Sequence, residues 1–166
     1  MANMKNNEGT LFMALEAGAS WPRYLRPLRQ AASNVQAVVQ TPGEPAEQFA
    51  KRALERWQLV LGTSAPPHRF VLGTNEHWDT VSSDVRHRLA RGAFGAPKSK
   101  GANELILWGG KLENAEDQGR LLALAGALVE RYAGSQRLVR VLFKEPEPFI
   151  RLSVPSKSEQ ARMSFA

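Results

Sequence analysis

Alternating strand-like and helix-like patterns predict an α/β fold for this chain. Short apolar runs begin near residues 35, 69, 103 and 137, and a longer segment with helical spacing follows each of the first three. Parallel strands are joined by crossover connections of this length, which are usually helical and right-handed. The pattern therefore predicts a three-layer, Rossmann-like α/β domain with a mainly parallel sheet of about four strands and an added N-terminal arm.

Composition divides the chain into three segments. Residues 1–33 form the N-terminal arm, which is expected to be partly disordered and able to pack on the core. The α/β domain spans 34–145, and the extension 146–166 is expected to hold a short added strand, near 149–154, before a frayed tail. Within the arm, the apolar run Thr10–Leu15 fits a strand or a helix equally, because periodicity does not separate the two in so short a run.

The remaining elements follow in chain order. The expected strands lie at 35–40, 69–74, within 103–111 and at 138–143, and the expected helices lie at 45–61, 80–94 and 115–132. In the first helix, Phe49, Ala53 and Trp57 recur at the spacing of one helical stripe. Arg140 interrupts the last strand, which indicates an edge position or a partly wet face. The sequence leaves the strand order open: a 2-1-3-4 order places helices on both faces, whereas a sequential order leaves one face to the arm.

The segment Asn103–Lys111 is the best candidate for a central strand. Its apolar run ends in Gly109, Gly110 and Lys111, which resembles half of a phosphate-binding loop. The following helix begins with acidic residues, and these repel the anion that a helix N-terminus attracts. No dinucleotide fingerprint or P-loop is present either. The glycines are therefore interpreted as a tight turn into an apolar helix, which is either well buried or used in self-association.

Composition sets the broad class of protein. The chain has 166 residues, no cysteine and a formal net charge of +6. The absence of cysteine excludes disulfides and thiolate catalysis and fits a reducing compartment. The N-terminus lacks the apolar core of a signal peptide, and no run has the length of a membrane span. We expect a cytoplasmic, basic protein without a transmembrane segment. Its modest positive charge permits nucleic acid as a partner without requiring it.

Ligands of open parallel sheets bind beyond the carboxyl ends of the strands. The residues expected on this rim are Thr74, Asn75, Glu76, His77 and Lys111. At this rim, the backbone amides of the turns and the side chain of Lys111 are expected to bind a small polar ligand. They do not form a recognisable catalytic set, since the nucleophile elbow and the metalloprotease helix are both missing. We expect no metal and no cofactor, and an enzyme is less favoured than a binding protein.

Two further groups of residues are candidate interaction surfaces. The interaction arm consists of Trp21, Arg23, Tyr24, Arg26 and Arg29, and the basic patch consists of Arg86, Arg88, Arg91, Lys98 and Lys100. Clustered cations can follow a phosphate backbone, although the patch has few aromatic residues for base stacking. The leading hypothesis is a non-catalytic binding or scaffold module acting through a protein partner or as a homo-oligomer. The alternatives are an enzyme or small-ligand domain using the strand ends, and a nucleic-acid-binding protein using the basic patch.

Overall fold

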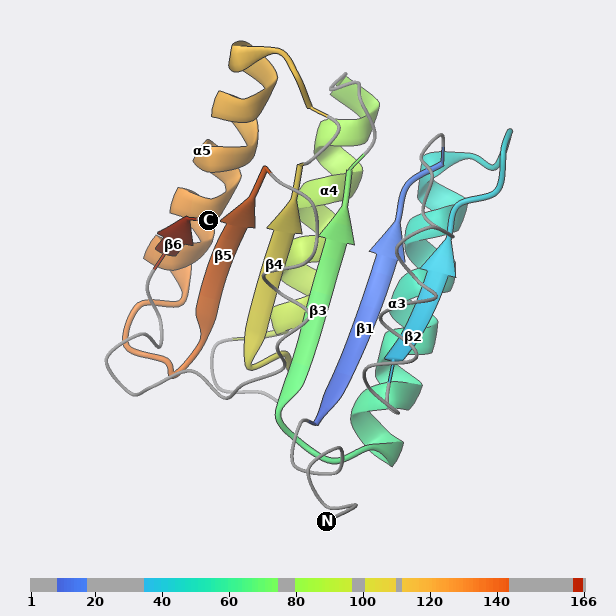
Figure 1. Ribbon diagram of the computed structural model, residues 1–166. Helices are drawn as coiled ribbons and strands as arrows, with labels where there is room; N and C mark the ends of the chain where they lie inside the picture. The colour runs from blue at the N-terminus through green and yellow to red at the C-terminus, as the bar shows by residue number, and fades with distance from the viewer. Residues whose placement is uncertain are drawn as a thin grey trace.

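A parallel sheet with helices packed on it forms the body of the protein, drawn from a computed structural model in Figure 1. The structure describes residues 9–17, 35–74, 80–96, 101–109, 112–143 and 163–165. The strands are β1 (Thr10–Leu15), β2 (Val35–Val39), β3 (His68–Gly73), β4 (Glu104–Trp108), β5 (Leu138–Leu142) and β6 (Met163–Phe165). The helices are α3 (Ala46–Thr63), α4 (Thr80–Phe94) and α5 (Ala115–Arg131).

The strand order is β2-β1-β3-β4-β5-β6, and every neighbouring pair is parallel. The predicted Rossmann-like α/β fold with a parallel sheet is therefore confirmed. The four strands expected from the sequence, β2 to β5, occur in chain order, and β1 is inserted between β2 and β3. The sheet exceeds the expected count because it also contains β1 and the short edge strand β6.

The strand β1 lies inside the sheet and belongs to its core. Its residues pair with β2 on one side and with β3 on the other, and all six are buried. Residues 10–15, which the sequence analysis grouped with the arm at 1–33, are thus part of the sheet. A strand buried on both faces has a continuous apolar run instead of an alternating one, which explains why periodicity left this segment open.

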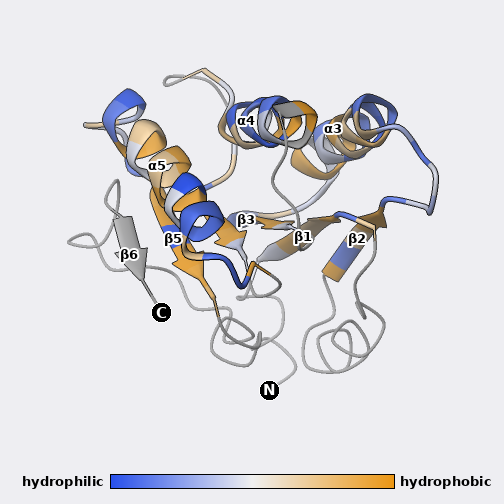
Figure 2. Ribbon diagram, turned by 90° about the horizontal axis from the view of Figure 1, so that it is seen from above, coloured by the Kyte–Doolittle hydropathy of each residue, from blue (hydrophilic) through white to orange (hydrophobic). Residues whose placement is uncertain are grey.

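The three helices α3, α4 and α5 lie on the same face of the sheet, as the view in Figure 2 shows. Phe12 and Ala14 of β1 point into the core beneath these helices. The alternate residues Leu11, Met13 and Leu15 belong to a second apolar cluster on the opposite face, and each is fully buried. Both faces of the central strands are therefore removed from water, as is usual for a parallel sheet.

Trp57 of α3 is the centre of an aromatic cluster under the helices. Its ring lies 5.5 Å from the Phe12 ring and 5.1 Å from the Phe70 ring, measured between centroids. The indole Nε1 donates a hydrogen bond of 3.1 Å to the carbonyl oxygen of Ala93 in α4. One fully buried side chain thus joins two helices to the two adjacent strands β1 and β3.

The apolar surface of α5 is used in the core. The side chains of Leu121, Leu124, Ala125 and Leu128 are buried against the sheet. A Cβ atom built on Gly109 would lie 2.7 Å from Leu121 Cδ2, so a side chain here would require Leu121 of α5 to shift. The glycine therefore serves close packing at the turn into α5, and the apolar composition of that helix is explained by burial.

Arg140 does not mark an edge of the sheet, because β5 lies between β4 and β6. Its Nε lies 2.7 Å from Glu104 Oε2, and Arg69 Nε lies 3.3 Å from the other oxygen of the same carboxylate. The edge interpretation was wrong, and the alternative of a partly wet face fits the 31% exposure of the Arg140 side chain. A carboxylate on the neighbouring strand makes an arginine tolerable at this interior position.

Several expectations fall outside the described residues. The segment near 149–154 is one of them, and the interaction arm at Trp21, Arg23, Tyr24, Arg26 and Arg29 is another. Within the extension 146–166, the strand that the structure describes is β6. No helix in the described ranges has the length and apolar character needed to cross a bilayer.

Replacing Trp57 with alanine tests the aromatic cluster. We expect Trp57→Ala to lower the free energy of unfolding by about 3–5 kcal/mol, because it removes a large buried side chain and leaves a cavity. Urea unfolding followed by circular dichroism measures this change. The matched control is Val81→Ala on α4, where the valine is 61% exposed, and there we expect a change within about 0.5 kcal/mol. Equal effects of the two substitutions would contradict the assignment.

Candidate functional site

The carboxyl edge of the sheet contains the position where the strand order reverses. From β1 the chain proceeds to β2 on one side, and it later returns to β3 on the other side of β1. In open parallel sheets, such a switch point is where ligands bind. Glu16 directly follows β1, and Thr74 directly follows β3, so these residues stand on the two sides of this position.

A buried ion pair links this edge to α4. Arg86 Nε donates to Glu16 Oε2 at 2.6 Å, and Arg86 Nη2 donates to Glu16 Oε1 at 2.5 Å. Arg86 is fully buried, and Glu16 is 5% exposed. The contact is bidentate, with two parallel N–H···O bonds between planar groups, which is the strongest geometry available to this pair of side chains. The pair therefore fixes the orientation of the guanidinium and of the carboxylate at the switch point.

Backbone hydrogen bonds hold the surrounding strand ends. Glu16 N donates to the Gly73 carbonyl at 2.9 Å, and Thr74 N donates to the Trp108 carbonyl at 3.0 Å. The Thr74 hydroxyl donates to the same Trp108 oxygen at 3.2 Å, and the residue is fully buried. Thr74 thus closes the turn after β3, and its hydroxyl is bonded to a carbonyl that is not a general base.

The structure locates only some of the residues predicted from the sequence. On the ligand rim it describes Thr74, whereas Asn75, Glu76, His77 and Lys111 lie outside the described residues. In the basic patch it describes the three arginines and not Lys98 or Lys100.

The basic patch does not form one surface over the arginines that the structure describes. Arg86 points into the protein and is bound to Glu16. Arg88 and Arg91 are exposed on α4, and Arg88 lies 3.5 Å from Glu47 of α3. Arg88 and Arg91 are three residues apart and share one face of α4, whereas Arg86, two residues before Arg88, points to the opposite side of the helix. The grouping of Arg86 with an exposed patch is therefore corrected.

His87 lies beside Arg86 on α4 and is half-buried. Burial lowers the pKa of the imidazole, and the nearby Arg91 lowers it further, while Asp84 acts in the opposite direction. Folding therefore favours the neutral imidazole relative to the unfolded chain. The described residues contain no group of three or more histidine and carboxylate side chains arranged to hold a metal ion.

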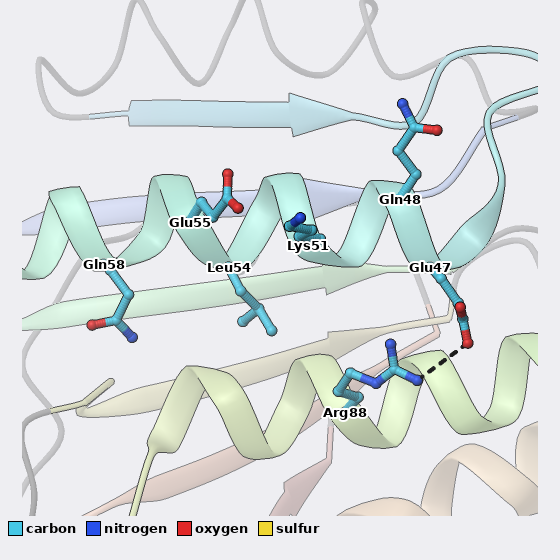
Figure 3. Close-up of a pocket in the computed structure, with 7 residues that line it drawn as sticks. All are labelled: Glu47, Gln48, Lys51, Leu54, Glu55, Gln58 and Arg88. Atoms are coloured by element: carbon cyan, nitrogen blue, oxygen red, sulfur yellow. Dashed lines mark hydrogen bonds and ion pairs between the residues drawn. The ribbon is translucent and has the colours of Figure 1, made fainter.

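A groove with a volume of about 640 Å³ lies between α3 and α4. Figure 3 shows Leu54 and Glu47 directed from α3 towards α4, where Glu47 meets Arg88. The remaining lining residues are Gln48, Lys51, Glu55 and Gln58. The exposed charges of both signs are typical of a solvated surface, and an exposed ion pair contributes little energy. The groove offers no buried polar group comparable with Glu16 and Arg86.

Glu16 was not predicted as a site residue, because the sequence did not show whether the preceding segment Thr10–Leu15 is a strand or a helix. A signal was present: a charged residue directly follows the apolar run Thr10–Leu15, where a parallel strand delivers its next side chain to the ligand-binding edge. Arg86 was noticed only as one cation among several. Its separation from Glu16 by 70 residues gives no sequence pattern that joins them.

Single and double substitutions of the ion pair test its role. We expect Glu16→Leu or Arg86→Met alone to lower the free energy of unfolding by about 3–5 kcal/mol, because each leaves a buried charge without its partner. The double variant Glu16→Leu/Arg86→Met replaces the pair with apolar groups of similar volume, and its stability should return close to that of the wild type. Denaturant titration of the four proteins measures the coupling. Additive losses in the double variant would contradict a mutually compensated pair.

The His87 environment predicts a dependence of stability on pH. Since the folded-state pKa is below the unfolded value of about 6.5, the unfolded chain takes up a proton first as the pH falls. The free energy of unfolding therefore decreases as the pH drops below that value, until the folded protein also protonates His87. We expect His87→Gln to reduce this decrease, measured by urea unfolding at several pH values between neutral and mildly acidic. An unchanged pH profile in the variant would rule out this contribution.

Comparison with protein-family models, curated proteins and solved structures found no match to this chain. The assignment of a functional site therefore depends on the position of Glu16 and Arg86 in the fold and on their chemistry.

Proposed function

We propose that this chain binds a small polar ligand at the carboxyl edge of its sheet, beside Glu16 and Arg86. The observation that carries the proposal is the buried bidentate ion pair at the switch point between β1 and β3. The general preference of open parallel sheets for ligands at this position supports it. The proposed rim residues Asn75, Glu76, His77 and Lys111 follow β3 and β4 in the chain and would provide the direct contacts.

Energetics supports a role for the ion pair beyond stability. Removing two charged groups from water costs several kcal/mol for each ion, and their attraction recovers that cost only with good geometry. An apolar pair of similar volume holds a core together at least as well. We infer that the charges are retained because they give the edge a fixed dipole that orients a polar ligand.

The charges at this edge favour a ligand whose own net charge is close to zero. The carboxylate of Glu16 and the guanidinium of Arg86 cancel, so the pair adds no net charge. The first turn of α5 carries Glu116 and Asp117, and Asn114 caps that helix by accepting a hydrogen bond from Glu116 N. Carboxylates at a helix start oppose the binding of phosphate there. A zwitterionic or uncharged polar molecule therefore fits better than a nucleotide.

The proposal describes binding and not catalysis. Thr74 carries a hydroxyl at the switch point, and that hydroxyl is bonded to the Trp108 carbonyl. The other two functions considered from the sequence have less support. Arg86 is buried in the core and is therefore not available to a nucleic-acid-binding surface. The apolar residues of α5 are buried against the sheet, so they are not available for self-association.

Thermal-shift screening tests the ligand-binding function. A ligand that binds only the folded state raises the melting temperature to an extent that grows with its concentration relative to its Kd. We expect amino acids and other small zwitterions or polyols to include a stabilising compound, and nucleotides to have a weaker effect.

The double variant Glu16→Leu/Arg86→Met, which is expected to be about as stable as the wild type, provides the matched control. It should fold and melt normally but lose the ligand-induced shift, and Lys111→Ala should weaken that shift without affecting the melting temperature of the free protein. An undiminished shift in the double variant would contradict a site at this edge. Stabilisation by nucleotides that falls steeply with added salt would favour the nucleic-acid alternative instead.

A further inference from the structure

The outer edge of β2 carries backbone groups that face away from the sheet. Gln40 N donates to the Leu15 carbonyl at 2.8 Å, so even-numbered residues of this segment direct their N–H and C=O groups towards β1. Successive residues of a strand alternate in direction. The N–H and C=O groups of the odd-numbered residues Val35, Ala37 and Val39 consequently point outward. Within the described ranges, no hydrogen bond reaches the outward groups of Val35 or Ala37.

The side chains of β2 do not protect this edge. Natural proteins discourage pairing at an edge strand with charged residues, proline or a bulge. The sequence of β2 is Val-Gln-Ala-Val-Val, which contains no charge and no proline. Most of its residues are partly exposed. The one local protection found in the described residues is Arg52 of α3, whose Nη2 donates to the Val39 carbonyl at 2.8 Å.

A surface hollow lies between this edge and α3, and the exposed apolar side chain of Leu59 lies beside it. A hollow of about 380 Å³ is lined by Ala37, Val38, Arg52, Glu55, Arg56 and Leu59. Leu59 is 59% exposed, and in the described part of the chain only Val81 is a comparably exposed large apolar residue. Figure 3 shows that Glu55 points away from the α4 side of the helix.

We propose that the chain forms a two-fold dimer in which the β2 strands of two copies pair antiparallel, centred on Ala37. In this register Ala37 lies opposite its own copy and Val35 lies opposite Val39. The outward N–H and C=O groups of Val35 and Ala37 then find partners, and the Val39 carbonyl accepts a second hydrogen bond beside the one from Arg52. The pairing forms about six backbone hydrogen bonds and joins the two sheets into one. The inference goes beyond ligand binding and is independent of it.

The helix α3 is complementary to itself in this arrangement. It packs over β1 and β2 (Figure 2), so the two α3 axes would lie about two strand spacings apart, roughly 10 Å. Packed helices are separated by about 8–10 Å. The two helices run antiparallel at the level of Ala37, which places Glu55 opposite Arg56 of the second copy and Leu59 opposite the stem of Arg52. A second copy therefore supplies charge complementarity at the centre and apolar contact at each end.

Charge reversal with complementation tests the dimer. The wild type should elute with a mass twice the 18.3 kDa of one chain in size-exclusion chromatography with light scattering. Glu55→Arg alone brings two guanidinium groups together at the centre of the interface, and Arg56→Glu alone brings two carboxylates together there. Each variant should raise the dimer Kd by at least about tenfold, a weakening that corresponds to about 1.4 kcal/mol. An equimolar mixture of the two should restore association, because each copy then meets the opposite charge.

An exposed leucine inside the proposed interface and an exposed valine outside it give a matched test and control. Leu59→Glu should weaken the dimer, whereas Val81→Glu, on α4 and 61% exposed, should leave it intact. Circular dichroism melts confirm that each variant is folded. A monomeric wild type at high micromolar concentration would overturn the proposal. So would a dimer that survives Glu55→Arg, Arg56→Glu and Leu59→Glu, because such a dimer uses another surface.

Discussion

A carboxylate that enters the protein interior needs a cation beside it, and this constraint connects the centre of the sheet to its helical layer. Glu16 directly follows the inner strand β1 and is buried, and Arg86 of α4 provides the compensating charge. An unpaired charge there would cost several kcal/mol. The pair therefore limits where α4 can lie relative to β1, and it places two charged groups at the switch point of the sheet.

The position of β1 accounts for most of the remaining architecture. Because β1 separates β2 from β3, the crossover from β2 through α3 passes over β1, and Trp57 packs between the two layers. The later units extend the sheet in one direction and place α4 beside α3, with α5 beyond α4 (Figure 2). β2 is left at the end of the described sheet with its outward backbone groups and the exposed Leu59. One inserted strand thus creates both the proposed ligand-binding edge and the proposed dimer edge.

Much of this fold was predictable from the sequence because its elements have strong local signals. The expected helix at 80–94 matches α4, and the others differ from α3 and α5 by one or two residues at their ends. The position of β1 was not predictable, since a fully buried strand and a buried helical turn look alike over six residues. The prediction that Arg140 marks an edge strand was wrong for a related reason. Its partner Glu104 lies on another strand, and a sequence does not show pairs that form only in three dimensions.

The candidate site was predictable in its location and not in its central residues. The carboxyl edge follows from the fold class alone, and Thr74 directly follows β3 at that edge. Glu16 and Arg86 depend on the strand order, which brings together residues 70 positions apart. The apolar composition of α5 was consistent with burial or association, and only the packing of Leu121 and its neighbours on the sheet decides between them.

The most direct test of a ligand site at the Glu16–Arg86 pair is nuclear magnetic resonance of the ¹⁵N-labelled protein. The Arg86 Nε–H group reports on the ion pair itself, and the amides of Glu16 and Gly73 report on the strand ends around it. Titration with a stabilising zwitterion or polyol should shift these signals together and leave the amides of the α3–α4 groove unchanged. Shifts confined to Lys51, Leu54 and Arg88 would place the ligand in that groove and contradict the account.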